Sequence, residues 1–402
     1  MLFQLMDSKE GCAGYYSDGE LIFDEEIDDT FTGTWKHSHT LEGKSNIEYA
    51  NLYCEGLSIE EACPGHLKER LDTHTQKLKA FLRSFSESKV CLKENCFYDL
   101  VPKKFLINYF GAKNDITEHV FENYERPFNY NYLRDLSRLL SQIRHRELNI
   151  DLSRLRDSAH TVQTKNFMKK IQQSKHVCDY NIFGTKTGRL TTIPGTFPIL
   201  TMDKKYRSII KPHNDWFLEL DFNAAELRTM LSMTDNAQPA LDIHEWNAKH
   251  IWNGKKDRQE AKKSIFAWLY NPKSSDRAPN KYYDRDFLLS KHYDTGTVAT
   301  PFGREMSVDR DHAVNYLIQG TTAELALRQL IRIWKYLSIP IPKPLKSFIA
   351  FTMHDSVVID LCHEERYLIP SLIYTYSATD MGEYVVNASA GRDFGNMKAL
   401  SR

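Results

Sequence analysis

The stretch WFLELDFNAAELR, residues 216–228, carries the pattern from which the rest of the chain is interpreted. Its first five residues are mostly apolar and are followed by the acid Asp221, which predicts a short strand with a carboxylate at its end. From residue 224 to residue 233 the apolar residues follow a helical period, so Glu226 is expected in the first turn of a helix. This strand and helix predict a carboxylate held on a rigid element.

A second acid is expected at a similar position. Residues 348–353 and 356–361 are two β-rich runs, and His354 and Asp355 between them predict a tight hairpin. Joining a nucleotide to a 3′-hydroxyl requires two Mg²⁺ ions, held by carboxylates on rigid elements, to neutralise the developing charge. Asp221 and Asp355 could supply these carboxylates, but acids at strand ends are common, so the two positions alone do not decide the function.

A third stretch, RQEAKKSIFAWLY at residues 258–270, places Arg258, Lys262, Phe266 and Tyr270 at intervals of four. On a helix these side chains share one slowly drifting face. Two cations followed by two aromatics could hold a triphosphate and then a sugar and a base. An amphipathic helix with its aromatics in a core explains the spacing equally well, so both interpretations stay open at this point.

Composition limits the class of protein. The chain has 402 residues, enough for two or three substructures, and lacks an apolar run that could cross a bilayer or act as a signal peptide. Its formal net charge is zero, but the charges are unevenly distributed, with an acidic head at residues 7–29 and basic runs at 186–211 and 249–263. Phosphate groups interact with such local basic runs and not with the net charge of the whole chain. The seven scattered cysteines predict ordinary thiols in a reducing compartment.

Helices alternating with short antiparallel strands predict an α+β fold. Long helices are expected over residues 57–85, 103–124, 131–146, 153–174 and 312–337, and a strand is expected at 19–23.

Six motifs in chain order resemble those of the family A, DNA polymerase I-like enzymes, and the general pattern is that of a compact phage-type member. Residues 221–228 resemble motif A, residues 258–270 motif B, and residues 354–356 motif C. Three further matches are TGRL at 187–190, DIH at 242–244 and NYLIQG at 315–320. The resemblance covers about residues 95–396. Six ordered matches favour the catalytic interpretation of the strand-end acids and of the helix at 258–270.

The resemblance implies a role for each matched residue. The implied metal ligands are Asp221, the main-chain carbonyl of Phe222, and Asp355, which would hold two Mg²⁺ ions that Mn²⁺ could replace. The implied nucleotide-binding residues are Arg258, Lys262, Phe266, Tyr270, Glu226 and His244, with Lys262 also a proton donor to pyrophosphate and Glu226 excluding a 2′-hydroxyl. The implied DNA-binding residues are Arg189, Asn315, Gln319 and His354.

The resemblance also implies a right-hand polymerase architecture, with an antiparallel palm sheet, helical fingers and a short helical thumb. The expected parts are an acidic N-terminal region at 1–100, interpreted as a remnant of an exonuclease-like domain, a thumb at 101–180, palm at 181–245, fingers at 246–295 and palm at 296–402. Expected partners are primer-template DNA and dNTPs, with a separate exonuclease, processivity factor or helicase as further candidates and no membrane. The expected location is the cytoplasm, that of the host cell if the protein is viral.

The sequence departs from the family pattern at three positions. Asn271 and Pro272 follow the motif B tyrosine where the family has Gly, and Ser356 follows Asp355 where the family has Glu. The sequence His354-Asp355-Ser356 also occurs in single-subunit RNA polymerases, so that class remains an alternative, as does a non-catalytic DNA-binding protein on the same fold. The head is too short for a full proofreading domain, and its acidic run at 24–26 has no partner motif, so we expect no exonuclease.

Overall fold

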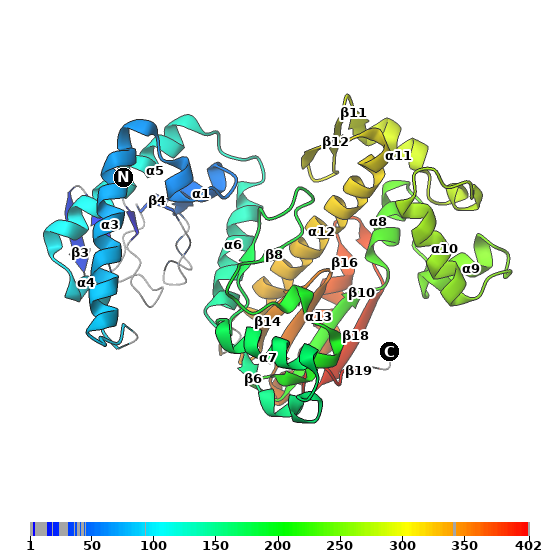
Figure 1. The fold of residues 1–402 in the computed structure, drawn as a ribbon. Coiled ribbons are helices and arrows are strands. Elements are labelled where there is room, and N and C mark those ends of the chain that lie inside the picture. The colour runs from blue at the N-terminus through cyan, green and yellow to red at the C-terminus, as the bar shows by residue number, and fades with distance from the viewer. Residues whose placement is uncertain are drawn as a thin grey trace. The chain divides into compact units, whose positions relative to one another are not determined.

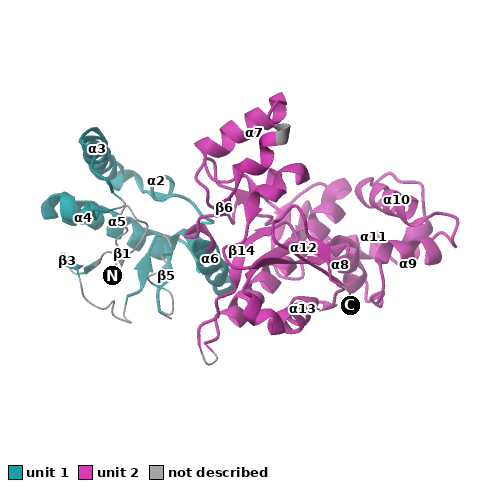
Figure 2. Cartoon of the chain, turned by 90° about the horizontal axis from the view of Figure 1, so that it is seen from below, with its two compact units in different colours: residues 1–142 teal, residues 143–402 magenta. Residues whose placement is uncertain are grey.

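The computed structural model describes residues 3–4, 14–17, 19–23, 31–35, 37, 41, 44, 46–92, 94–340 and 343–400. The chain forms two compact units, residues 1–142 and residues 143–402, coloured separately in Figure 2. The acidic run at 24–26, considered above as an exonuclease feature, lies outside the described residues.

The first unit combines a small sheet with a helical layer. Its strands are ordered β3-β2-β1-β4-β5, with bounds β1 Phe3–Gln4, β2 Gly14–Ser17, β3 Glu20–Phe23, β4 Gly33–Thr34 and β5 Glu48–Tyr49. Its helices are α1 Ala50–Tyr53, α2 Ile59–Ala62, α3 Gly65–Glu87, α4 Phe97–Leu100, α5 Lys103–Asn123 and α6 Tyr130–Arg144. The helix α5 packs against α3 and this sheet, and its Phe105, Phe110 and Val120 belong to the core of the first unit. The structure therefore divides after residue 142, whereas the sequence suggested a boundary near residue 100.

The second unit is built on a five-stranded antiparallel sheet, ordered β14-β15-β10-β18-β19 (Figure 1). The bounds are β10 Trp216–Phe222, β14 Phe348–Met353, β15 Ser356–Leu361, β18 Val386–Gly391 and β19 Lys398–Ala399. All six residues of β15 are buried, the polar Ser356 and Asp360 as well as the apolar residues. The central strand β10 lies between β15 and β18, so the acid at its end is held on both sides.

Helices cover this sheet and extend beyond it. They are α7 Val162–Gln173, α8 Ala225–Met233, α9 Ile243–His250, α10 Arg258–Tyr270, α11 Arg285–His292, α12 Arg310–Leu337 and α13 Ile369–Ser377. The long helix α12 packs against α8, α11, α13 and β14, while α10 packs against α9. A small sheet adjoins α11 and α12, with strands β11 Tyr293–Asp294, β12 Thr297–Ala299 and β13 Glu305–Ser307.

Short two-stranded pairings complete the second unit. They are β6 Asn149–Ile150 with β9 Ile210–Lys211, β7 Tyr180–Asn181 with β8 Thr191–Thr192, and β16 Ala378–Thr379 with β17 Gly382–Glu383.

Two of the expected helices are wrong. Residues 153–174 do not form a single helix but a 3₁₀ segment, Leu152–Ser158, followed by α7. The break occurs because the Thr161 side chain accepts a hydrogen bond from the Thr164 amide and so starts a new helix. The helix expected over residues 57–85 is also divided, into α2 and α3, because Pro64 lies between them. The remaining long helices and the strand at 19–23 are confirmed to within a few residues at their ends. Among the described residues, no helix is both long and apolar enough to cross a membrane.

Candidate active site

The carboxylates of the candidate site come from two neighbouring strands. Asp221 lies in the register position opposite Ser356, the first residue of β15, and Asp355 directly precedes Ser356 in the hairpin turn. His354 at the start of this turn has a positive φ of 57°, which lets β14 reverse into β15 within two residues. The Ser356 hydroxyl donates to the Met353 carbonyl at 3.0 Å and so closes the turn. The fold thus brings together two acids that are far apart in the sequence.

The two carboxylates interact electrostatically. Burial, followed by the negative charge of Asp355, raises the pKa of Asp221 to about 7, while a hydrogen bond with Asn387 opposes the shift. Burial also raises the pKa of Asp355. Two half-buried acids with raised pKa values form a site at which a cation would relieve the cost of burying their negative charges.

The carboxylates of Asp221 and Asp355 suit a hard divalent cation that takes its other ligands from water and substrate phosphates. Within the described ranges, no three His, Cys, Asp or Glu side chains cluster closely enough to hold a metal by themselves. Magnesium is commonly bound through only one or two carboxylates, with water and substrate phosphates completing its shell. Asp221 and Asp355 meet that requirement, whereas the Phe222 ring points into the core, stacked 4.5 Å from Tyr376, so only the main-chain carbonyl of Phe222 could contribute.

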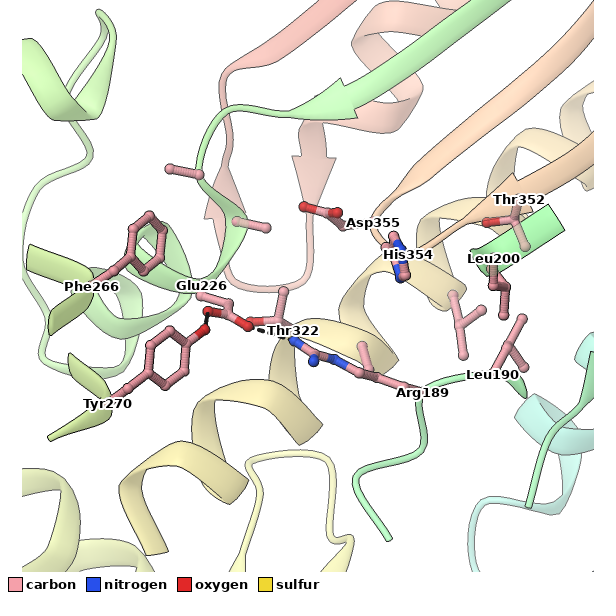
Figure 3. Close-up of a pocket in the computed structure, with 14 residues that line it drawn as sticks. Arg189, Leu190, Leu200, Glu226, Phe266, Tyr270, Thr322, Thr352, His354 and Asp355 are labelled. Atoms are coloured by element: carbon pink, nitrogen blue, oxygen red, sulfur yellow. Dashed lines mark hydrogen bonds and ion pairs between the residues drawn. The ribbon is translucent and has the colours of Figure 1, made fainter. Parts of the chain in front are cut away.

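A cavity of about 370 Å³ opens beside Asp355 (Figure 3). It is lined by Arg189, Leu190, Leu200, Ala224, Ala225, Glu226, Phe266, Tyr270, Thr322, Ala323, Leu327, Thr352, His354 and Asp355. Within it, the Glu226 carboxylate accepts from Arg189 Nη2 at 2.5 Å and from the Tyr270 hydroxyl. Burial, together with the hydrogen bond to Glu226, raises the pKa of Tyr270 above its ordinary range, so this phenol stays protonated and donates. Glu226 therefore links the loop of Arg189 to α10.

The helix α10 places its four spaced residues outside the fully buried core stripe. Its core-facing residues are Ala261, Ile265, Trp268 and Leu269. Lys262 and Tyr270 are exposed, and Phe266 is half-buried with its ring stacked on that of Tyr270 at 6.0 Å. Phe266 and Tyr270 line the cavity, so the aromatic pair does not belong to the buried core stripe. The helix begins with a capping box between Asp257 and Glu260 and ends where Asn271 turns extended before Pro272.

Of the residues expected at the triphosphate, Arg258 is already paired within the protein and His244 is uncharged. Arg258 forms a forked ion pair with Asp242, with Nε–Oδ1 3.1 Å and Nη2–Oδ2 2.7 Å. Burial by itself would raise the pKa of Asp242, but the hydrogen bonds from Arg258 and from backbone amides hold it below its usual range. Burial lowers the pKa of His244 to about 4, so its ring is neutral at pH 7, and its buried Nδ1 has no partner among the described residues. Lys262, the remaining expected triphosphate residue, forms no ion pair with any residue that the structure describes.

The four expected DNA contacts are distributed over two places. Arg189 and His354 line the main cavity, and Gln319 on α12 hydrogen-bonds with Tyr270. Asn315, one turn earlier on α12, lines a different cavity of about 470 Å³ beyond the C-terminal end of α10. The structure therefore groups three of the four residues with the carboxylates and places Asn315 apart.

Comparison with known proteins identifies the fold. No protein-family model matches the sequence, and neither does any curated protein. Among solved structures, the polymerase domain of Pol1 from M. smegmatis, in complex with DNA primer-template and dNTP, is similar with a TM-score of 0.66. The match covers 98% of this chain and 95% of that chain at 12% sequence identity. The chain has the fold of a Pol1-type polymerase domain. At the level of the fold, this confirms the family resemblance and the expected α+β polymerase architecture.

Two residues of this polymerase fold that support the carboxylates were missed by the sequence analysis. The Tyr376 hydroxyl on α13 donates to the Asp355 carbonyl at 2.7 Å, and its ring stacks on Phe222, so it connects both acid-bearing segments. Asn387 on β18 is paired in register with Asp221 and hydrogen-bonds its side chain. No motif marks either residue. Asn387 lies on β18, a strand that was not among the expected elements, and only the pairing of β18 with β10 places it beside Asp221.

The raised pKa of Asp221 predicts a cost in stability. An unfolded Asp loses its proton near pH 3.8, whereas folded Asp221 retains it to about pH 7. The unfolded state therefore binds fewer protons between these values, and stability falls as pH rises through this range. We expect Asp221→Asn to raise the free energy of unfolding of metal-free protein by roughly 2–4 kcal/mol at pH 8 and by little at pH 4. Denaturant unfolding in EDTA at both pH values measures this, and an equal effect at both would contradict it.

Proposed function

We propose that this protein is a template-directed DNA polymerase that adds dNTPs to a primer 3′ end by two-metal-ion phosphoryl transfer. The observation that carries the proposal is the meeting of Asp221 and Asp355 at one end of the sheet, beside a cavity lined by Glu226, Phe266 and Tyr270. The similar Pol1 domain was solved with primer-template and dNTP, which supports the same ligands here. The proposed fingers correspond to α9–α11 and the proposed palm to the five-stranded sheet with α12.

The proposed chemistry assigns each side chain a task. Asp221 and Asp355 would hold Mg²⁺, or Mn²⁺ in its place, which supplies charge neutralisation for the attacking and leaving oxygens. Lys262 extends from the exposed face of α10, where an ammonium can approach a triphosphate and donate a proton to departing pyrophosphate. Arg258 would join it only by exchanging its ion pair with Asp242 for a phosphate. His244 is neutral and can donate one N–H to a phosphate oxygen without adding charge.

Glu226 is the proposed sugar gate. Its carboxylate is held on two sides, by the Arg189 guanidinium and by the Tyr270 hydroxyl, and Phe266 lines the same cavity. A carboxylate held by two hydrogen bonds cannot easily change its position. A 2′-hydroxyl would therefore clash with it, and the carboxylate oxygens already accept hydrogen bonds from Arg189 and Tyr270. The fixed carboxylate favours deoxynucleotides over ribonucleotides.

We therefore expect Glu226→Ala to reduce the preference for dNTP over NTP, measured as the ratio of kcat/KM values, by about tenfold or more. The turnover with dNTP should also fall, because Tyr270 loses its acceptor. Glu305→Ala is a matched control, since Glu305 is an exposed glutamate on β13 that does not line the cavity. An unchanged ratio in Glu226→Ala would remove Glu226 as the gate.

Primer extension on a primed DNA template, with dNTPs or NTPs supplied separately, tests the proposed function. Extension with dNTPs supports a DNA polymerase, extension with NTPs alone would favour a single-subunit RNA polymerase, and binding without extension would indicate a non-catalytic DNA-binding protein. A primer with a mismatched 3′ nucleotide is a second substrate. Release of that nucleotide by purified protein would contradict the proposed lack of proofreading.

A further inference from the structure

A buried glutamate on α12, Glu324, does not line the main cavity and has no part in the proposed chemistry. Only 2% of this residue is exposed. Its Oε1 accepts from Nε and Nη2 of Arg328, at 3.2 and 2.8 Å, one turn further along the helix. Its Oε2 lies 3.9 Å from Nε of Arg304, and neither of these two atoms has a hydrogen-bond partner among the described residues. Because a buried carboxylate is unfavourable without cations beside it, Glu324 holds both arginines in place.

Arg304 belongs to the tight hairpin between β12 and β13. Its amide donates to the Thr300 hydroxyl at 3.1 Å, and its carbonyl accepts from the Thr300 amide at 2.9 Å. The ring of Phe302, in the same turn, lies 4.6 Å from the Arg328 guanidinium. Glu324 and its two arginines therefore attach this hairpin to α12.

The Arg304 guanidinium lies directly against Gly188, in the loop at residues 185–190. A β-carbon at Gly188 would come within 2.8 Å of Arg304 Cζ, which is closer than van der Waals contact allows. Gly188 also has a positive φ of 73°, which other residues rarely adopt. The guanidinium therefore packs against the loop backbone at a distance that only glycine permits.

The residue after Gly188 is Arg189, which contacts Glu226 across the cavity (Figure 3). The distance from Arg189 Nη2 to Glu226 Oε1 is 2.5 Å, so a shift of the loop by about 1 Å would lengthen it to the limit of a hydrogen bond. The Arg189 side chain is long and 44% exposed, so its direction depends on the backbone that carries it. Contacts therefore run from the buried carboxylate on α12, through Arg304 and the loop, to Glu226.

We propose that Glu324 and Arg304 are positioning residues for sugar selection, because they hold the loop at 185–190 where Arg189 reaches Glu226. The inference rests on the proposed function, in which Glu226 excludes the 2′-hydroxyl. Glu324 and Arg304 act on the nucleotide only through Arg189 and Glu226.

The test measures the ratio of kcat/KM for dNTP over NTP in Glu324→Gln, in Arg304→Met and in wild type. We expect each variant to lower this ratio by about three- to tenfold, because Glu226 loses one of its two hydrogen-bond donors. In a Glu226→Ala background the same substitutions should change the ratio by less than about 1.5-fold, since the group that they position is absent. A loss of folded protein alone would lower both kcat/KM values equally and would not change their ratio.

Hydrogen exchange of backbone amides is a second readout, independent of catalysis. The Gly188 amide donates to the Thr185 carbonyl at 3.2 Å, so its exchange reports on the loop. We expect exchange at residues 185–190 to be at least about fivefold faster in Arg304→Met, with exchange in β10 unchanged. The matched control is Arg332→Met, which removes the ion pair of Arg332 with Asp380, about two turns after Glu324 on the same helix. It should change neither the ratio nor the loop exchange.

The possible outcomes separate this inference from the proposed function. A wild-type protein that neither binds nor extends primer-template contradicts the polymerase proposal, and the role in sugar selection with it. A wild-type protein that extends primers, with an unchanged ratio in both variants, overturns the positioning role and leaves the polymerase proposal standing. The same holds if the ratio falls as much in the Glu226→Ala background. If Glu324→Gln fails to fold, Arg304→Met, whose side chain is 22% exposed in the wild type, decides by the same comparison.

Discussion

Asp221→Ala and Asp355→Ala are each expected to lower primer extension by at least about a thousandfold, equivalent to ~4 kcal/mol of transition-state stabilisation. Burial raises the pKa of both carboxylates, and the negative charge of Asp355 raises that of Asp221 further, so a bound cation would relieve an unfavourable concentration of charge. Removing either one leaves the other unable to hold a cation pair by itself, because no third acid or imidazole clusters with them in the described ranges. Steady-state single-nucleotide incorporation in Mg²⁺ measures the loss.

The control for this result is Asp215→Asn. Asp215 directly precedes β10 at the opposite end from Asp221, and its carboxylate accepts from the His363 amide. We expect it to retain most of the activity. Circular dichroism should show that both alanine variants are folded, and either of them retaining more than about a tenth of wild-type turnover would exclude its carboxylate as a metal ligand.

Lys262→Ala is expected to lower kcat by about a hundredfold while changing the affinity for primer-template by less than about threefold. Lys262 lies on the exposed side of α10, in line with the cavity-lining Phe266 and Tyr270. Three residues are expected at the triphosphate. Arg258 is paired with Asp242 and His244 is neutral, so Lys262 is the one whose positive charge forms no ion pair with a described residue. A charge that meets the phosphates as they develop negative charge acts in the transition state and not on the duplex.

The control for Lys262 is its neighbour. Lys263→Ala removes an equally exposed lysine from the same helix but from a position about 100° further round, so it should change kcat only slightly. Pre-steady-state incorporation and equilibrium DNA binding should be measured on both variants. Equal losses of catalysis and DNA affinity in Lys262→Ala would place this face of α10 against the duplex instead of the triphosphate.

The sequence by itself determined most of the local elements and which residues of α10 share a face. The mostly apolar, β-branched and aromatic runs at residues 216–221 and 356–361 correctly predicted the strands β10 and β15, because such residues fit a largely buried strand. The four-residue spacing of Lys262, Phe266 and Tyr270 predicted a shared face because helical geometry fixes it. Ordered motifs then indicated the polymerase fold, which the comparison with the Pol1 domain confirmed at the level of the fold.

Only the tertiary structure decided how these residues are used. The pairing of β10 with β15 brings Asp221 beside Asp355, and burial then raises both pKa values, which no sequence spacing reveals. The ion pair of Arg258 with Asp242 and the separation of Asn315 from the main cavity depend on contacts between elements that are distant along the chain. Periodicity reports which face of an element is buried, whereas hydrogen bonding, desolvation and charge coupling depend on what the neighbouring element places against that face.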